Sequence, residues 1–590
     1  MRARVDVGQL ATLAGTVGVI ERRVDTETTA VAGALAVIAR TGSGASSRAT
    51  AAVGLAAAAR LEALAQLAAL RTVVALAADV YAGVEARVAA LVGARPAPPR
   101  LRRLLAAAQV DDLEALLVSA PALAAAVAAG ATTAAGVVES LIRTLLLPPP
   151  VAAREQAGIL GRLDPRARRL LALTEPGLMT ALVGAPASDR FAASRVLVAA
   201  DLSRLLQRRA LVGAQPRLDE RIAMRRRLLD EDVVLRHPDG TTTRHRHQLL
   251  VFDPAGDGRV VEVVGDLHRA RHLAVFVPGT GSDLDRYPGS LQRLVPFAAA
   301  DPALAVVLWQ DADHPDAPFD DPPPPPADLA RRGAAQQYLR EHVIAAAYRD
   351  AADLAGPVLA ADIAGLRVAL AGPASDLTVL GHSYGGSIVG SAEAHGMVVD
   401  RVVHVASAGA YVRDVADYAS PSAERFAMTA FDDPVRLAQG HDAADSPTRL
   451  RTMLPAALDP LAPAVAGAAV AVAPSPAAVG HGLDPDLLPG VVRLDTGVQV
   501  DGRLVRGHSG MFAPGSTAWR NLLAVMTRGR VQVLQPGLWS SHLDPLGVEA
   551  HLPTAGPDPV VHVHLPRYVI DRTPYADPGY RAPTLDLGPG

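Results

Sequence analysis

The chain has 590 residues, too many for one hydrophobic core, so two or more domains are expected. Its formal net charge of −3 gives no indication of nucleic-acid binding. Cysteine is absent, which excludes a cysteine nucleophile, disulfide bonds and thiolate metal sites. Lysine is absent too, so a serine enzyme in this chain would need histidine as its base.

Two long uncharged stretches, residues 115–138 and 460–483, are rich in alanine and interrupted by proline, so neither is apolar enough to span a bilayer. Arg2 and Arg4 are followed by a mixed segment and not by the apolar core of a signal peptide. We therefore expect no transmembrane segment. The protein is expected to be cytoplasmic, or exported by a route that cleaves no signal peptide.

Residues 1–95 are predicted to form a hairpin of two long helices. A glycine-containing turn at residues 41–44 interrupts the helical pattern, and a second helical segment covers about residues 45–92. Tyr81 and Glu85 lie four residues apart near its end. This arrangement resembles the helical hairpins of type VII secretion, which implies a type VII-like export route and a helical partner. Simple helix packing or dimerisation is the alternative.

Residues 96–230 are predicted to form a second helical region. Pro148, Pro149 and Pro150 interrupt it, while Asp164 and Asp189 are typical of helix starts. With residues 1–95, this makes the N-terminal part of the chain all-helical.

The pattern changes after residue 231 to short apolar or alternating segments, which predict β-strands. They are residues 233–235, 249–252, 260–264, 273–278, 303–309, 377–380, 398–405, 425–431 and 491–494. Helices are expected between them, among them residues 328–370 and 516–525. Apolar strands that alternate with helices indicate an α/β fold with a mostly parallel sheet covered on both faces. Catalytic groups are expected at the carboxyl ends of such strands.

Residues 377–390 read LTVLGHSYGGSIVG, and contain the pattern G-x-S-x-G between an apolar strand and a helix. In this context the pattern predicts a sharp turn, a nucleophile elbow, that exposes the hydroxyl of Ser383. The start of the helix also directs free backbone N–H groups towards that position. Ser383 is therefore a candidate nucleophile. The alternative is an ordinary serine in a tight turn.

A serine hydroxyl is a weak nucleophile, and needs a base that is oriented by a carboxylate. In this kind of fold the partners follow in the order serine, acid, histidine. Asp433 follows a predicted strand and is the preferred acid, with its neighbour Asp432 as the alternative. His508 follows the last strand of the sheet and precedes a helix, so it is the preferred base. Three other histidines lack that context: His441, His481 and His542.

An oxyanion hole needs two backbone N–H groups that converge on the carbonyl oxygen of the substrate. Tyr384, the residue after Ser383, is expected to supply one of them. Thr280 is expected to supply the other, because Gly279 and Gly281 on either side let the backbone approach closely.

Residues 275–282, residues 381–386 and the Asp433–Pro434 pair look like the alpha/beta-hydrolase superfamily. More narrowly, they are similar to an actinobacterial alpha/beta-hydrolase family of unknown function. The resemblance covers about residues 274–525, and implies a hydrolase fold and a catalytic triad but no named substrate. Pro278 stands where many members have histidine. An alanine- and proline-rich insert at about 437–489 separates the acid from the last strand.

The sequence thus predicts a hydrolase domain at residues 231–530, followed by an arm at 531–590 with a partly disordered end. The predicted function is a serine hydrolase of the esterase type, which cleaves a small-molecule ester, or an amide or thioester, through an acyl-enzyme. This chemistry needs no metal or organic cofactor. The second hypothesis is a helical partner-binding or secreted module with a catalytically inactive hydrolase domain.

Overall fold

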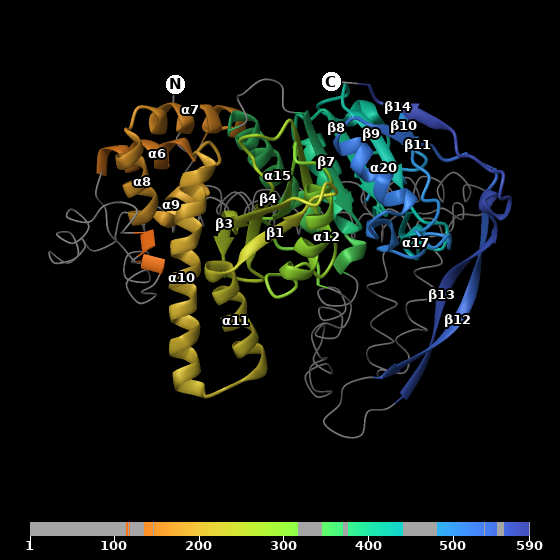
Figure 1. Cartoon of the computed structure of the whole chain (residues 1–590), viewed down its shortest axis with the longest axis horizontal. Helices are drawn as coiled ribbons and strands as arrows, with labels where there is room; N and C mark the ends of the chain where they lie inside the picture. Colours follow the sequence, from red (N-terminus) through yellow and green to blue (C-terminus); the bar gives the residue numbers. More distant parts are fainter. Residues whose placement is uncertain are drawn as a thin grey trace, which may run out of the picture. The chain divides into compact units, whose positions relative to one another are not determined.

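The computed structural model describes residues 114–115, 117–118, 135–145, 147–316, 345–369, 376–439, 481–535, 537–551 and 560–588 (Figure 1). The predicted N-terminal hairpin, with Tyr81 and Glu85, lies outside the described residues. So do residues 440–480, which make up most of the predicted insert. The predicted helix at 328–370 is described only in its second half.

An eight-stranded sheet forms the centre of the described chain, in the order β10-β9-β8-β7-β5-β6-β4-β3. Its strands are β3 (Gln248–Asp253), β4 (Arg259–Val264), β5 (His272–Val277), β6 (Leu304–Gln310), β7 (Asp376–His382), β8 (Arg401–Val405), β9 (Glu424–Met428) and β10 (Val491–Arg493). Neighbours from β10 to β6 are parallel, while β4 runs antiparallel to both β6 and β3. The prediction of a mostly parallel sheet is therefore confirmed.

The central strands are largely apolar because helices cover both faces of the sheet. These helices are α12 (Tyr287–Ala300), α15 (Asp350–Ala369), α16 (Tyr384–Ala394) and α20 (Thr517–Met526). Side chains alternate along each strand: Phe276 and Leu380 pack in one core with α12 and α20, and Val275 and Val379 pack in another with α15 and α16. Two predicted strands are longer than the observed ones, since β8 begins only at Arg401 and β9 ends at Met428.

A helical region precedes the sheet, as predicted. Its described helices are α6 (Ala135–Thr144), α7 (Pro149–Gly161), α8 (Pro165–Thr174), α9 (Pro176–Ala181), α10 (Ala187–Val212) and α11 (Pro216–Asp230). The side chain of Asp164 caps α8 by accepting a hydrogen bond from the Ala167 N–H at 3.0 Å. In Figure 1, α10 and α11 run side by side and extend away from the sheet.

This helical region shares a core with the sheet. Val196 of α10 and Ile222 of α11 belong to the same buried cluster as Phe252 of β3. Arg190 of α10 is buried, and its Nε donates a hydrogen bond to the Leu250 carbonyl of β3 at 3.2 Å. The burial of one continuous apolar surface therefore joins α10 and α11 to the edge of the sheet.

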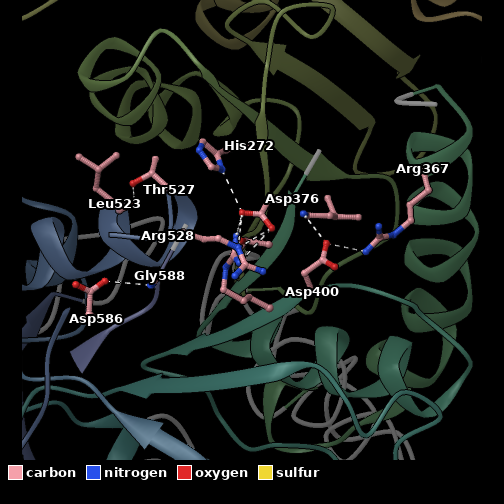
Figure 2. Close-up of polar contacts among 12 residues, drawn as sticks. His272, Arg367, Asp376, Asp400, Leu523, Thr527, Arg528, Asp586 and Gly588 are labelled. Carbon is pink, nitrogen blue, oxygen red and sulfur yellow. Dashed lines mark hydrogen bonds and ion pairs between the residues drawn. The ribbon is translucent and has the colours of Figure 1, made fainter. Parts of the chain in front are cut away.

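A polar cluster lies at the amino ends of the parallel strands, at the opposite edge from Ser383. The Asp376 carboxylate of β7 accepts hydrogen bonds from Arg401 Nη2 of β8 at 2.7 Å and from Arg528 Nε at 2.9 Å. His272 Nδ1 of β5 lies 3.2 Å from the same carboxylate (Figure 2). Because Arg528 follows α20, this cluster fixes the end of that helix to three strands of the sheet.

Three further two-stranded sheets are separate from the eight-stranded sheet. They are β1 (Asp232–Arg236) with β2 (Thr242–Arg246), β11 (Arg530–Gln532) with β14 (Thr584–Asp586), and β12 (Ser540–His551) with β13 (Val560–Arg572), each antiparallel. In the predicted arm, β14 pairs with the edge that β11 offers, and the Val533 N–H also donates to the Pro583 carbonyl at 2.8 Å.

Candidate functional site

Ser383 lies at the sharp turn between β7 and α16, with φ 58° and ψ −127°. A non-glycine residue in this region costs about 1–3 kcal/mol, so the surroundings must hold it there. The Ser383 N–H donates to the Val405 carbonyl at 3.1 Å, and its carbonyl accepts from the Ala408 N–H at 3.0 Å. Glycine is required at 385, because a Cβ there would lie 2.2 Å from the Val277 carbonyl oxygen. The turn is therefore held by both neighbouring strands.

His508 and Asp433 are brought together from distant parts of the chain. The Nδ1 of His508 lies 2.9 Å from Asp433 Oδ1 and 3.1 Å from Oδ2. The Asp433 side chain is fully buried, whereas that of His508 is 34% exposed. Asp433 Oδ1 also accepts from the Val435 N–H at 2.9 Å, which orients the carboxylate. A buried carboxylate on Nδ1 leaves Nε2 as the nitrogen that can exchange a proton with a ligand.

Asp432, the alternative acid, contacts the same turn in a different way. Its Oδ1 accepts a hydrogen bond from the Gly507 N–H at 2.9 Å, and its Oδ2 lies 3.6 Å from Arg506 Nη1. Gly507 has φ 67°, a value that favours glycine. Of the two neighbouring carboxylates, one contacts the imidazole of His508 and the other holds the backbone of the turn.

His382 joins the turn of Ser383 to the turn of His508. Its Nε2 lies 2.8 Å from the carbonyl oxygen of His508, and the centroids of the two rings are 4.7 Å apart. Phe276 stacks on His382 from one side, and Phe512 meets it edge-on. Burial, and then the nearby His508, lower the pKa of His382 to about 3. His382 is therefore neutral, and its Nε2–H donates to the carbonyl. The sequence pattern predicted no role for His382.

The loop after β5 lies directly against Ser383. A Cβ at Gly279 would lie 2.5 Å from Ser383 Cβ and 2.9 Å from Ser383 Oγ, so only glycine fits. The loop is fixed by the Gly281 N–H, which donates to the Pro315 carbonyl at 2.7 Å. In the part of the chain that the structure describes, the backbone N–H groups of Thr280 and Tyr384 have no hydrogen-bond acceptor. Tyr384 follows Ser383 directly, and Thr280 follows the glycine that lies against it.

The rival histidines have other surroundings. His481 is buried against α16, where its Nδ1 accepts from Ser387 Oγ at 2.9 Å and its Nε2 donates to the Ala346 carbonyl at 3.0 Å. His542 is half exposed on β12, and its Nδ1 lies 2.6 Å from Asp571 of β13. His441 lies outside the described residues.

A cavity of about 950 Å³ lies beside the turn that carries His508. Its walls come from residues 499–504, together with Arg506 and Pro514. Residues 499–503 form a tight turn, in which the Gln499 N–H donates to the Arg503 carbonyl at 2.7 Å. A space of this size is enough for a small organic ligand.

The described residues contain no group of three or more histidine or acidic side chains that could hold a metal ion. Of the helices in the described ranges, none is both long and apolar enough to cross a bilayer.

Comparison with known proteins gives similar proteins of undetermined function. A segment of the chain is 34% identical over 159 residues to two uncharacterized proteins of Mycobacterium tuberculosis, Rv2079 and MT2140. The match covers 25% of this chain and 21% of each relative, so the chain spans about a fifth of the curated relatives' length.

Solved structures of esterases are also similar to parts of the chain. An esterase from Pseudomonas putida ECU1011 is 17% identical with a TM-score of 0.14, over 36% of this chain and 57% of that protein. A double mutant of the esterase rPPE is 15% identical with a TM-score of 0.16, over 48% of this chain and 68% of that protein. Scores this low support no statement about function.

The family comparison covers the segment that contains the serine turn. Residues 253–441 match the family described as alpha/beta hydrolase. They include β5 to β9, the glycine loop, Ser383 and Asp433, and leave His508 outside the match. This segment of the chain is therefore an alpha/beta-hydrolase domain by similarity.

Proposed function

We propose that this protein is a serine hydrolase that cleaves an ester, or a chemically related amide or thioester, through an acyl-enzyme. Ser383 is the nucleophile, His508 the general base and Asp433 the acid that orients it. The observation that carries the proposal is the contact between His508 Nδ1 and the buried Asp433 carboxylate, at 2.9 Å. This contact fixes the tautomer in which Nε2 can take a proton.

In the reaction, His508 Nε2 accepts the proton of Ser383 Oγ while the oxygen attacks the carbonyl carbon of the substrate. The same nitrogen then returns the proton to the leaving alcohol, which leaves the acyl group on Ser383. Water, deprotonated in turn by His508, attacks the acyl-enzyme and releases the acid. Asp433 stabilises the imidazolium in both steps, and no metal or organic cofactor takes part.

The negative charge that develops on the substrate's carbonyl oxygen needs two donors. The N–H groups of Thr280 and Tyr384 are the proposed oxyanion hole, because Tyr384 follows Ser383, Thr280 follows Gly279, and neither N–H has an acceptor among the described residues. The loss of one such donor typically reduces kcat by about 10²–10³-fold. The proposed substrate is a small acyl compound.

A fluorophosphonate probe tests the assignment directly. The folded full-length chain should become labelled on Ser383, and Ser383→Ala should lose both labelling and p-nitrophenyl ester hydrolysis. Ser509→Ala is the matched control, because Ser509 is an exposed serine next to His508 and should react as the wild type does. Unlabelled wild-type protein, with the same ester turnover as Ser383→Ala, would contradict the proposal. It would favour the helical partner-binding module with an inactive hydrolase domain.

A further inference from the structure

His382 precedes Ser383 in the chain and contacts the backbone of His508, the proposed base. We propose that His382 is a positioning residue, which holds the backbone of His508 at a fixed distance from Ser383. The inference rests on the proposed function and adds a residue to it. The contact that carries it is the 2.8 Å hydrogen bond from His382 Nε2 to the His508 carbonyl.

Among the described residues, three side-chain hydrogen bonds hold the turn of His508, and each fixes a different atom. Asp432 accepts from the Gly507 N–H at 2.9 Å, and Asp433 accepts from the His508 ring at 2.9 Å. Both carboxylates follow β9, so they place the turn relative to that strand alone. The third contact comes from His382 at the end of β7, and it alone of the three ties the turn to the strand that carries Ser383.

The position of the His382 ring is itself well defined. The side chain is buried between Phe276, at a centroid distance of 6.4 Å, and Phe512, at 5.1 Å. Phe512 lies four residues after His508, so the same chain segment that receives the hydrogen bond also packs on the ring. A buried donor of this kind has little freedom to move, and it transmits the position of β7 to His508.

The charge state of His382 fits this role. Its pKa is lowered to about 3, first by burial and then by the neighbouring His508. The ring thus stays neutral while it donates from Nε2. A charged ring 4.7 Å from His508 would oppose the imidazolium that forms when Ser383 loses its proton.

Substitution of His382 should lower the rate of the chemical step without a change in substrate binding. His382→Phe keeps an aromatic ring between Phe276 and Phe512 but removes the N–H donor. We expect kcat to fall by about 10- to 100-fold with KM unchanged. Labelling of Ser383 by the fluorophosphonate should slow by a similar factor. His382→Gln keeps an N–H donor and should be less impaired. If His382→Phe loses about 100-fold in kcat, His382→Gln should lose about tenfold or less.

His404→Phe is the matched control. His404 is a fully buried histidine on β8, directly opposite Gly381 in register, and its ring nitrogens have no hydrogen-bond partner among the described residues. The same substitution there should leave kcat within about twofold of the wild type. Thermal unfolding of all three variants identifies any loss of activity that is caused by instability alone. The comparison of His382→Gln with His382→Phe tests the N–H donor at one position.

Three outcomes would overturn the inference, and the last is distinguishable from the first two. If the wild type is labelled on Ser383 and His382→Phe retains wild-type kcat and labelling, or if His382→Gln is as slow as His382→Phe, His382 does not position the base. If the wild type shows no labelling and no turnover that depends on Ser383, the proposed function fails, and this inference fails with it.

Discussion

The imidazole of His508 donates a hydrogen bond to the buried carboxylate of Asp433, a residue 75 positions earlier in the chain. Asp432, its immediate neighbour, binds the backbone of Gly507 instead. Two adjacent aspartates thus hold the same turn by different groups. Substitution of Asp432 can therefore serve as the comparison for substitution of Asp433.

Asp433→Asn and Asp432→Asn should therefore have unequal effects. An amide at 433 cannot stabilise the imidazolium and favours the wrong tautomer, so kcat should fall by about 10³–10⁴-fold. An amide oxygen at 432 still accepts from the Gly507 N–H, so kcat should fall by about tenfold or less. Steady-state hydrolysis of a p-nitrophenyl ester measures both. Equal losses in the two folded variants would contradict the assignment of Asp433 as the acid.

Gly279→Ala should remove activity because of a direct steric conflict. The added methyl group would lie 2.5 Å from Ser383 Cβ and 2.9 Å from Ser383 Oγ, so either the loop or the serine must move. We expect kcat/KM to fall by at least about 100-fold, while circular dichroism shows a folded protein.

Gly289→Ala is the control for that substitution. Gly289 lies in α12, and no atom comes within 4 Å of the position of its Cβ. Alanine there should keep full activity and stabilise the helix by about 0.5–1 kcal/mol. Wild-type kcat/KM in Gly279→Ala would show that the loop does not lie against the serine during the reaction.

Buried histidines should make the protein sensitive to acid. Burial lowers the pKa of His314 to about 4, and that of His382 and of His404 to about 3. In the unfolded chain each titrates near its ordinary value of about 6.5, so between these values the unfolded state binds protons that the folded state does not. Their contribution to stability is therefore complete above about pH 6.5 and is lost as the pH falls towards 3.

The free energy of unfolding, measured between pH 7 and pH 4, should show this loss. In His404→Phe, the slope of that free energy against pH should be smaller by the uptake of up to about one proton. The Asp433-linked His508 is left unchanged in that variant. A slope that is identical in wild type and His404→Phe would mean that His404 is accessible to protons in the folded state.

The cluster around Asp376 should contribute to stability and not to catalysis. Asp376→Asn leaves the guanidinium groups of Arg401 and Arg528 without their carboxylate, and Arg401 is fully buried. Removal of one partner from such a buried pair costs about 3–5 kcal/mol. Urea unfolding should show this loss, whereas kcat of the folded variant should stay within about threefold, because the cluster lies at the opposite edge from Ser383.

Asp586→Asn supplies the comparison for the cluster. Asp586 pairs with Arg530 at 3.5 Å, and both side chains are more than half exposed. Loss of an exposed pair should change the free energy of unfolding by less than about 1 kcal/mol. If the two asparagine variants lose the same free energy, the Asp376 cluster has no special role in holding α20.

The sequence predicted what depends on local pattern. Continuous apolar segments such as β6, which is buried at every position, indicated a parallel sheet with both faces covered. The glycines around Ser383 predicted a strand–helix turn, since few other residues permit that close approach. The arm was predicted less well: β12 contains proline and glycine, and became a strand through its pairing with β13.

Contacts between distant segments could not be read from the pattern. By sequence alone, Asp432 and Asp433 are nearly equivalent, and the direction of the chain after β9 decides which of them reaches the imidazole. His382 looked like a spacer in a motif, yet the fold places the carbonyl of His508 within 2.8 Å of it. Apolar periodicity and glycine sterics act within a few residues, so the sequence determined the sheet and the serine turn. Hydrogen bonds between loops depend on how strands assemble, so the tertiary structure alone decided which side chains surround that serine.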